Sequence, residues 1–454
     1  MQTRERHSFS GSLGYVLSTA GSAVGLGNIW RFPYLAAKYG GGAFLLVYIL
    51  LAVTFGYTMI VSETALGRMT RRSPVGAFSR FSSSAPAKAG GWLNAIIPML
   101  ILPYYSVIGG WVLRYLFGYL RLSGGAMAAD GNFEAFIGNP GTSVFWFVLF
   151  ALATMAVVFA GVQGGIEKVS TIMMPVLILL SVVVAGFSVT RPGALPGVSY
   201  FLIPDLSRLS LMTVVAALGQ MFYSLSIAMG ILVTFGSYMQ KDADIERSTM
   251  QVEIFDTSVA ILAGLMVIPA VFAYSGGTPE ALGKGPALMF VTLPKVFFSM
   301  RGGAFIGALF FALVFFAALT SSVSLAESAV STIEDELHLS RRPACLALSC
   351  IMLPLGLLSC LGFNVLSGVA PLGMDFLSFF DFLTNSVMMP VAAAAICILV
   401  LRCVGVSRME EEVLSSSAFR RMGLYRFILR YVALALLAVI LISSAMDAFG
   451  ILRI

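Results

Sequence analysis

The chain has 454 residues, of which 58% are hydrophobic and 11% are charged, and its mean hydropathy is +0.92. This composition excludes a soluble globule, and it predicts an all-α polytopic membrane protein surrounded by lipid. The net charge is +6, but the basic residues are not interleaved with aromatic ones, so we expect no nucleic acid partner. The five cysteines lie in or beside late apolar segments, where we expect neither disulfides nor a metal site.

Apolar runs long enough to cross a bilayer recur along the whole chain. We predict about eleven spanning helices, each with on the order of 20 residues. The runs cover residues 12–36, 42–67, 89–121, 143–162, 166–189, 210–238, 251–275, 302–334, 343–362, 376–402 and 424–449. Glycine and proline pairs interrupt residues 275–300, which we interpret as a structured outer loop.

Lys and Arg are divided unevenly between the two sets of loops. With a cytoplasmic N-terminus, the inner loops carry about twice as many of these residues as the outer loops. We therefore expect a multi-pass protein of the plasma membrane, which in a bacterium is the inner membrane. Its N-terminus would be cytoplasmic and its C-terminus extracytoplasmic.

Small and polar residues interrupt the first predicted span. Residues 20–33 read Ala-Gly-Ser-Ala-Val-Gly-Leu-Gly-Asn-Ile-Trp-Arg-Phe-Pro. Unpaired backbone groups are costly in hydrocarbon, so Gly21, Gly25 and Gly27 are tolerable only where the freed groups bind a ligand or line a polar cavity. Asn28 and Arg31 are also costly in lipid, and they favour a functional site over a helix kink or a close helix contact.

The sixth predicted span contains a matching interruption, at residues 219–230. Paired interruptions in corresponding places predict two inverted repeats with a binding site between them. We expect one domain of residues 1–454, with a first repeat at about 10–190, a second at about 208–403 and an extra helix at about 424–449. A kink or a close helix contact is the alternative reading of this second break as well.

The sequence resembles the neurotransmitter:sodium symporter family, and its bacterial eleven-helix amino-acid members most of all. The matching motifs are Gly25-Leu-Gly-Asn-Ile-Trp-Arg-Phe-Pro-Tyr34, Gly40-Gly-Gly-Ala-Phe44 and Leu319-Thr-Ser-Ser322. The resemblance implies the LeuT-type fold, a five-plus-five inverted repeat in which helices 1 and 6 are broken. It also implies sodium-coupled symport of an amino acid by alternating access.

Other functional classes fit less well. An intramembrane enzyme would need a nucleophile with a base, or metal ligands, inside the bilayer, and the predicted spans offer no such set. A ligand-gated cation channel and a non-transporting amino-acid sensor of the same fold stay open, because sodium ligands and charged gates also serve conduction. A transporter of another small zwitterion with a carboxylate is the remaining alternative.

The resemblance implies two sodium sites built from oxygen atoms at the breaks. The ligands of the first site are Ala23, Asn28, Ser224 and Asp256. The ligands of the second site are the carbonyls of Gly21, Val24 and Ala317 and the hydroxyls of Thr320 and Ser321. For these two hydroxyls, back-bonding to the preceding helical turn is the alternative.

Asp256 departs from the family pattern. Many members have asparagine here and a chloride-binding serine four residues later, where this chain has Ala260. Because a fixed carboxylate can replace a mobile anion, we expect Na⁺ at two sites and no chloride requirement. A hydrated carboxylate beside Glu253 is the alternative.

Gly25 indicates the substrate class. In the monoamine branch of the family an aspartate at this position meets the amine, whereas Gly25 and Gly27 leave backbone amides for a carboxylate. The resemblance therefore implies a neutral, mostly apolar L-amino acid, with the Tyr105 hydroxyl on its carboxylate. The expected substrate site is Ala23, Gly25, Gly27, Ile101, Tyr105, Tyr223, Ser224, Ser226, Ala228, Met229, Ser321 and Leu325. Ala228 replaces a common glycine, and we expect its methyl group to exclude the largest side chains.

The resemblance also implies two gates. At the outer gate Arg31 pairs with Asp381, with Asp375 as the competing acid, and Tyr105 and Tyr223 form a lid over the substrate.

At the inner gate Arg6 pairs with Asp335, braced by Ser237 and Tyr238. Solvated surface charge is the alternative for Arg6 and Asp335. Phe9 stands where members usually have tryptophan.

The fifth span carries Gly165 and, after nine intervening residues, Pro175. Proline removes a helical hydrogen bond. The resemblance implies that this pair is a hinge, at which the cytoplasmic end of the span unwinds and lets water reach the second sodium. The alternative is an ordinary kink. For the assembly we expect a monomer or a weak homodimer.

Overall fold

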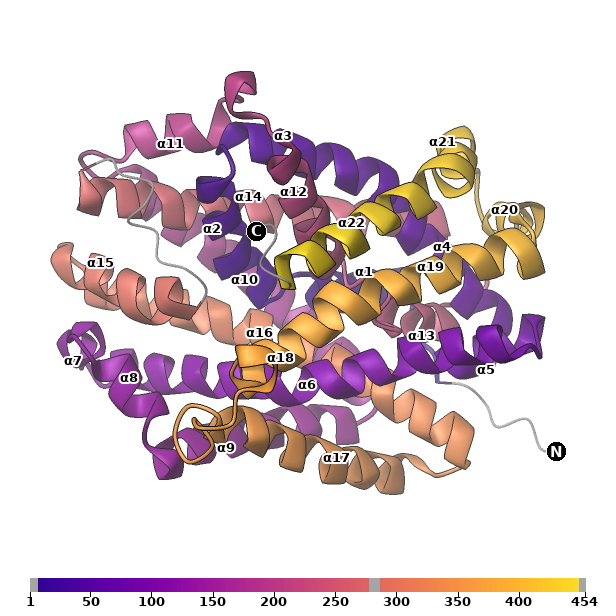
Figure 1. Cartoon of the computed structure of the whole chain (residues 1–454), viewed down its shortest axis with the longest axis horizontal. Helices are drawn as coiled ribbons and strands as arrows, with labels where there is room; N and C mark the ends of the chain where they lie inside the picture. Colours follow the sequence, from indigo (N-terminus) through magenta and orange to yellow (C-terminus); the bar gives the residue numbers. More distant parts are fainter. Residues whose placement is uncertain (1–6, 277–285, 449–454) are drawn as a thin grey trace.

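The computed structural model describes residues 7–276 and 286–448, and over these residues the chain is almost entirely helical. Figure 1 shows the helices packed side by side, with the long helices α6 (Ala85–Leu120), α14 (Ile245–Ser275) and α16 (Gly303–Leu337) running along the bundle. Strand-like pairing in these ranges is limited to one isolated bridge between Gly41 and Pro204. The predicted all-α fold class is confirmed.

Nine helices within the described ranges are long and apolar enough to cross a membrane. They cover Gly42–Thr70, Ala85–Leu120, Pro140–Phe159, Val162–Val189, Ile245–Ser275, Gly303–Leu337, Arg341–Leu361, Phe376–Val404 and Met422–Ser444. Such helices satisfy their backbone hydrogen bonds internally, as hydrocarbon requires. Several contain a π-helical turn; the first of the nine, for example, consists of α3 (Gly42–Leu51), η2 (Ala52–Gly56) and α4 (Tyr57–Thr70).

Two further apolar segments are divided into shorter helices. The first forms α1 (Ser12–Ala23), η1 (Gly27–Arg31) and α2 (Phe32–Lys38). The second forms α12 (Leu211–Ser224) and α13 (Ile231–Tyr238). These two broken segments and the nine continuous ones correspond to the predicted spans, and the broken ones are the first and the sixth. The prediction of a polytopic bundle is therefore confirmed.

The remaining elements complete the spans and their connections. The other span segments are α9 (Pro140–Phe159), η3 (Val162–Glu167), α10 (Lys168–Val189), α17 (Arg341–Leu361), α18 (Phe376–Asp381), α19 (Met389–Leu399), α21 (Met422–Phe427) and α22 (Ala433–Ala448). The connecting helices are α5 (Pro74–Phe81), α7 (Gly124–Ala128), α8 (Asn132–Ile137), α11 (Leu195–Leu202), α15 (Leu293–Ser299) and α20 (Val406–Leu414). The loop predicted at residues 275–300 contains α15, and its residues 277–285 lie outside the described ranges.

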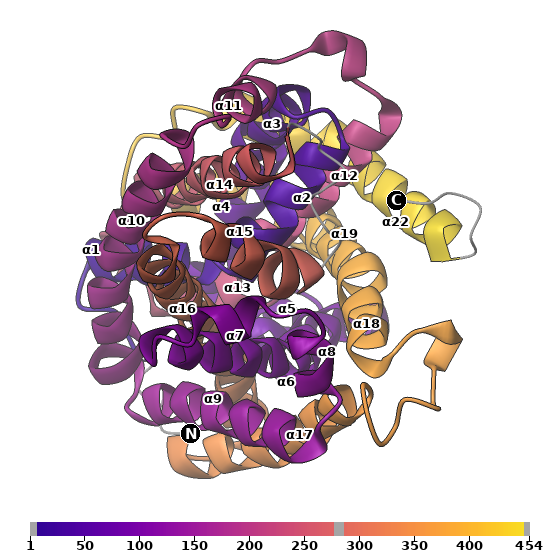
Figure 2. The ribbon, with the colours of Figure 1, turned by 90° about the vertical axis from the view of Figure 1, so that its left-hand side faces the viewer.

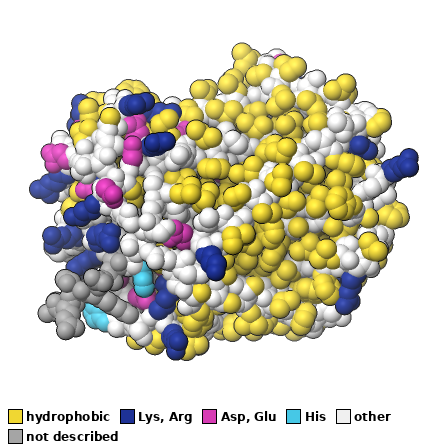
Figure 3. Space-filling model, turned by 180° about the vertical axis from the view of Figure 1, so that it is seen from behind, with side chains coloured by type: hydrophobic (Ala, Val, Ile, Leu, Met, Phe, Trp, Pro, Cys, Tyr) yellow, Lys and Arg dark blue, Asp and Glu magenta, His cyan; other side chains and the backbone are white. Residues whose placement is uncertain are grey.

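The two ends of the bundle differ in charge. Figure 3 shows Lys, Arg, Asp and Glu side chains gathered at one end, while hydrophobic side chains cover most of the remaining surface. We call this end, which carries α5, α20 and α21, the basic end (Figure 1). Figure 2 shows α7, α8 and α15 lying across the opposite end. Inside the bundle α6 packs extensively on α16, and α13 packs on α4.

Candidate functional site

Both broken helices leave backbone groups without helical partners at mid-span. α1 ends at Ala23, Val24 is extended, and helical structure resumes at Gly27. After α12, Ser226, Ala228 and Gly230 adopt left-handed conformations with φ of 54°, 59° and 69°. Non-glycine residues rarely adopt such conformations, and they tend to do so at functional sites. The two interruptions thus expose amides and carbonyls for a ligand.

The two breaks contact each other directly. The Ser22 and Ser226 hydroxyl oxygens lie 3.1 Å apart, and Gln220 Nε2 donates a hydrogen bond to the Gly27 carbonyl at 3.0 Å. One small cavity lies between them, lined by Ser22, Ala23, Gly25, Leu26, Gly27, Asn28, Ile101, Tyr105, Tyr223, Ser224, Ser226, Met229, Ile231, Ser321 and Leu325. This set contains every expected substrate residue except Ala228.

Space is limited around Gly25 at the first break. A Cβ on Gly25 would lie 2.7 Å from Ser321 Oγ and 2.9 Å from the Tyr105 hydroxyl oxygen. The amide that meets the Tyr105 hydroxyl is that of Leu26, which donates at 3.1 Å. Sequence reasoning named the amides of Gly25 and Gly27 and missed this one, since a leucine side chain gives no information about its own backbone N–H.

A buried cluster of oxygen atoms surrounds Asp256 on α14. Its Oδ1 accepts hydrogen bonds from Asn28 Nδ2 and Ser224 Oγ, both at 2.7 Å. Its Oδ2 accepts from the Tyr48 hydroxyl, also at 2.7 Å. Asp256 is 0% exposed, so it is not a hydrated surface carboxylate. The structure therefore brings together Asn28, Ser224 and Asp256, and it adds Tyr48, whose only signal in the sequence was a hydroxyl within an apolar span.

The expected ligands of the second sodium also converge. Ser321 Oγ on α16 lies 3.2 Å from the Gly21 carbonyl, 3.0 Å from that of Ser22 and 3.4 Å from that of Val24. Ser321 therefore reaches across to the broken helix.

Thr320, by contrast, donates to the Phe316 and Ala317 carbonyls of its own helix at 3.0 and 3.2 Å. This is the back-bonding geometry, and it keeps the Thr320 hydroxyl beside the Ala317 carbonyl.

A second buried carboxylate supports the break after α12. Glu63 on α4 is 0% exposed, and its Oε1 accepts from the Ala228 N–H at 2.8 Å. Within the described part of the chain, Glu63 Oε2 has no hydrogen-bond partner. Because Ala228 is held toward Glu63 and does not line the small cavity, this geometry does not support direct contact between its methyl group and a substrate. Sequence reasoning missed Glu63, although an acidic residue inside an apolar span is itself a signal of a functional or structural role.

A larger cavity, of about 570 Å³, adjoins the small one on the side away from the basic end. Arg31, Tyr223, Asp375 and Asp381 all line it, and Tyr223 also lines the small cavity. The Arg31 guanidinium lies 5.3 Å from the Tyr223 ring centroid. Among the ion pairs of the described residues, none joins Arg31 to either aspartate.

The two candidate gate acids have different hydrogen-bond partners. Asp381 accepts from Asn385 Nδ2 at 2.6 Å and from the Tyr104 hydroxyl at 3.3 Å. Asp375 caps the N-terminus of α18 by accepting from the Ser378 N–H at 2.9 Å. Asp375 also accepts from the Ser378 hydroxyl at 2.7 Å, so its partners lie within its own helix turn, whereas Asp381 also contacts Tyr104 of α6.

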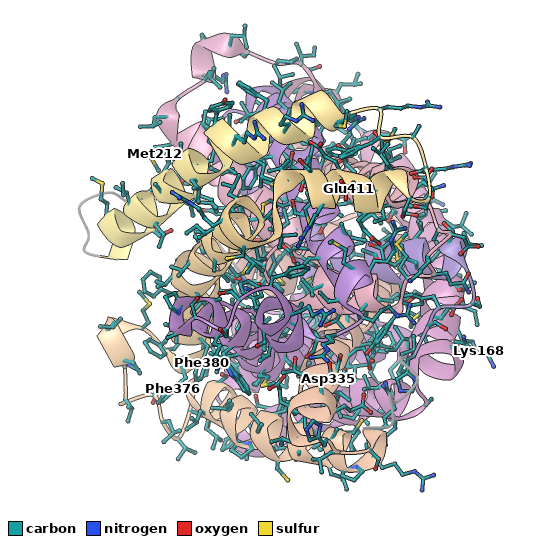
Figure 4. The ribbon with its side chains drawn as sticks, turned by 90° about the vertical axis from the view of Figure 1, so that its right-hand side faces the viewer. Lys168, Met212, Asp335, Phe376, Phe380 and Glu411 are labelled. Atoms are coloured by element: carbon teal, nitrogen blue, oxygen red, sulfur yellow. The ribbon has the colours of Figure 1, made fainter. Side chains whose placement is uncertain are left out.

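At the basic end, the structure describes three of the four expected gate residues, namely Asp335, Ser237 and Tyr238. Arg6 lies outside the described residues. Asp335 accepts from the Ser73 N–H at 2.7 Å, and Ser237 donates to the Thr234 carbonyl at 2.6 Å. Figure 4 looks onto this end and labels Asp335 on α16 together with residues of α10 and α20.

Tyr238 forms a hydrogen bond with one member of a buried ion pair that the sequence did not predict. Its hydroxyl donates to Glu327 Oε1 at 2.7 Å, and Glu327 pairs with Arg341 at 2.5 Å. Arg341 also donates to the Val158 carbonyl at 2.6 Å, so this network joins four helices. Phe9 is 1% exposed and packs against Tyr238, and its N–H donates to the Tyr238 carbonyl at 3.1 Å. The N-terminal segment is therefore anchored without the usual tryptophan.

A second charged network fills the same end. Arg68 at the end of α4 is 1% exposed and pairs with Glu412 of α20 at 2.6 Å. It also donates to the Ala243 carbonyl at 2.7 Å and to Ser416 Oγ at 2.9 Å. These contacts fix the segment around α20 against α4.

The predicted hinge residues lie in one continuous span. Gly165 is in the π-helical turn η3, where a Cβ would lie 2.0 Å from the Val157 carbonyl oxygen. Pro175 lies inside α10. Glycine allows the close approach to α9, and proline removes one hydrogen bond of the helix.

The chain belongs to the sodium:neurotransmitter symporter family, whose model matches residues 6–123 and 131–450. It is thus a membrane transporter and not an enzyme. It is 34% identical to the uncharacterized sodium-dependent transporter YhdH of Bacillus subtilis, over 95% of this chain and 96% of the relative. It is 32% identical to an uncharacterized sodium-dependent transporter of Haemophilus influenzae, over 87% of this chain and 89% of the relative.

A solved structure gives the same fold. The crystal structure of MhsT in complex with L-phenylalanine matches with a TM-score of 0.88 and 36% identity, covering 97% of this chain and 100% of that chain. The family resemblance inferred from the sequence motifs is confirmed, and the protein is a sodium-dependent transporter of this family.

Proposed function

We propose that the protein is a sodium-coupled symporter that imports a neutral, mostly apolar L-amino acid by alternating access and without chloride. The observation that carries this proposal is the cavity between the two breaks, which places backbone amides and the Tyr105 hydroxyl beside Ile101, Met229 and Leu325. A site with polar groups at one side and apolar side chains at the other fits an α-amino acid. The likeness to MhsT, solved with L-phenylalanine, supports the same substrate class.

In this proposal the substrate carboxylate binds at the first break. The Leu26 and Gly27 amides lie at the start of a helical segment, where an anion is favoured, and Tyr105 donates to the same group. The ammonium group binds carbonyls freed after α12. The apolar side chain contacts Ile101, Met229 and Leu325.

Sodium is a co-substrate in this mechanism. The first sodium ion binds Ala23, Asn28, Ser224 and Asp256 together with the substrate carboxylate. The bound ion and the bound substrate therefore stabilise each other. The second ion binds between the carbonyls of α1 and the hydroxyls of Thr320 and Ser321. Oxygen ligands of this kind suit a hard cation.

Asp256 supplies the negative charge that other members obtain from chloride. It is buried among Asn28, Ser224 and Tyr48, which hold its carboxylate in place. We expect uptake to be unchanged when gluconate replaces chloride. A collapse of uptake in gluconate would contradict this part of the proposal.

We place the basic end in the cytoplasm, following the distribution of Lys and Arg in Figure 3. The large cavity beside Arg31 then faces outside, and the C-terminus is extracytoplasmic. On closure Arg31 and Asp381 pair above Tyr223, while unwinding between Gly165 and Pro175 opens the inner route. The repeats, at about 10–190 and 208–403, carry the paired breaks.

Uptake into proteoliposomes tests the proposal. A symporter accumulates labelled leucine against its gradient when sodium is higher outside, and accumulation disappears when the sodium gradient is absent. A channel would only equilibrate the label, and a sensor would bind it without flux. Failure of every neutral amino acid to compete with leucine would contradict the proposed substrate class.

A further inference from the structure

The linker between α20 and α21 is held against the seventh span through its backbone. Glu246, in the first turn of α14, is 3% exposed. Its Oε2 accepts from the Arg420 N–H at 2.6 Å, and its Oε1 accepts from the Arg421 N–H at 2.9 Å. The Tyr57 hydroxyl donates to the same carboxylate at 3.1 Å. These contacts fix the linker to α14 at the basic end, where α21 begins the eleventh span (Figure 1).

From this anchor, the Arg421 side chain reaches a second buried carboxylate on α14. Arg421 Nη1 lies 3.5 Å from Glu253 Oε2, and the Arg421 guanidinium carbon lies 4.9 Å from the centroid of the Tyr57 ring. The Glu253 side chain is 5% exposed, whereas that of Arg421 is 33% exposed. A cation on a partly exposed linker is therefore placed beside an anion inside the bundle.

Glu253 is a neighbour of the first proposed sodium site. Asp256 follows it by three residues on α14, and helical side chains at this spacing are adjacent, with about 5–6 Å between their Cβ atoms. The two carboxylates are close enough for their charges to interact. In the described part of the chain, Glu253 Oε1 accepts no hydrogen bond. Among these residues, Arg421 is the cation that balances the charge of Glu253.

This pair has no part in positioning Asp256. Both Asp256 carboxylate oxygens already accept hydrogen bonds, from Asn28 and Ser224 on one side and from Tyr48 on the other. Charge, however, acts beyond contact distance, because the effective dielectric constant inside a protein is about 20 instead of about 80 in water. A carboxylate one turn from Asp256 therefore attracts a sodium ion at the first site, and the guanidinium beside that carboxylate opposes the attraction.

We infer that the ion pair of Glu253 and Arg421 sets the sodium affinity of the first site. Glu253 adds negative charge that favours the ion, and Arg421 offsets this charge so that the ion is released more readily. Because Arg421 precedes the eleventh span, a part of the chain outside the two repeats then contributes to ion binding. This inference rests on the proposed function, since it assigns electrostatic control to the first sodium site of the proposed symporter.

Removing the two charges together and one at a time tests the inference. The full-length protein, purified in detergent, binds labelled leucine at increasing sodium chloride, with choline chloride added to keep the ionic strength constant. We expect Glu253→Gln to raise the half-saturating sodium concentration about fivefold, because the charge of Arg421 is then unbalanced. Combining Glu253→Gln with Arg421→Gln should bring it back to within about twofold of the parent, because the two effects have opposite signs.

Two further variants serve as independent checks. Arg421→Gln alone should lower the half-saturating sodium concentration, since the charge of Glu253 is then no longer offset, and this variant tests the inference even if Glu253→Gln does not fold. Arg420→Gln is the matched control. It removes the exposed neighbouring guanidinium but keeps the backbone N–H that binds Glu246, so its sodium requirement should match that of the parent.

The direction of the shifts separates charge balance from a structural role. If the pair only stabilised the fold, both single variants would shift the sodium requirement in the same direction, and the double variant would be at least as impaired as either. That pattern would overturn the inference, and so would an unchanged sodium requirement in Glu253→Gln. If leucine binding by the parent itself does not depend on sodium, the proposed function fails instead.

Discussion

The end of the bundle that carries Arg31 contains a cavity of about 570 Å³, whereas the basic end is filled by charged side chains in direct contact. At the first end Arg31 and Asp381 line the same cavity without pairing. At the basic end Arg341 pairs with Glu327, and Arg68 pairs with Glu412.

This difference shows how one fold can open at one end only. A buried ion pair contributes little net stability, but removing one partner leaves an uncompensated charge. The basic end is therefore closed by contacts that are costly to break one at a time. The opposite end contains the large cavity, in which Arg31 lies beside the Tyr223 ring and forms no ion pair with Asp381 among the described residues.

The largest expected effect comes from breaking the closed end. Arg341→Ala leaves Glu327 buried with a tyrosine hydroxyl but no cation, and the loss of one partner of such a pair costs about 3 to 5 kcal/mol. We expect a clear fall in the melting temperature of the detergent-solubilised protein and loss of sodium-driven uptake. Arg342→Ala, at the exposed neighbouring position, is the control and should melt like the parent. Equal melting of the two variants would refute the importance of this ion pair.

An intermediate effect is expected from the open end. In Asp381→Asn the charge that attracts Arg31 is lost, so the outer gate closes less well. We expect uptake to fall about tenfold, equivalent to about 1.4 kcal/mol, while substrate binding persists. Asp375→Asn is the matched variant, because it lines the same cavity and asparagine also caps helices. A larger loss of uptake in Asp375→Asn would assign the gate to that residue.

The smallest effect is expected at the exposed ion pair between Asp130 and Lys295, on the loops that cover the open end. Hydrogen bonding and charge attraction from Lys295 lower the pKa of Asp130. A lowered folded-state pKa stabilises the fold above the unfolded-state pKa of about 3.9, and this contribution disappears as the pH falls through the lowered value. Solvent screens such a pair, so Asp130→Asn should melt like the parent at pH 7. A fall as large as that of Arg341→Ala would show that the outer loops are as tightly fixed as the basic end.

The sequence was sufficient to predict the spans and the breaks, since each depends on local patterns. Apolar length predicts a helix, and glycine with asparagine in a span predicts its interruption. The cavity residues at the first break and on α16 followed because the family motifs at residues 25–34 and 319–322 lie there. The structure added the contacts between Asn28, Ser224 and Asp256.

The residues that sequence reasoning did not identify depend on contacts between distant parts of the chain. Tyr48, Glu63 and Glu327 lie in predicted spans, and each forms a hydrogen bond with a residue of another span that is distant in the chain. A sequence gives the cost of such a residue in lipid but not the identity of its partner. The Leu26 amide was missed because backbone donors carry no side-chain signal.

Arg68 has a consequence for the order in which the protein is made. Its partner Glu412 is 344 residues further along the chain. At roughly 5 to 20 residues per second, about 20 to 70 seconds of synthesis separate the two residues. During that time the second span is complete while the guanidinium at its end still requires hydration, so this end must remain at the membrane surface. The final seal of the basic end therefore forms only after nearly the whole chain has left the ribosome.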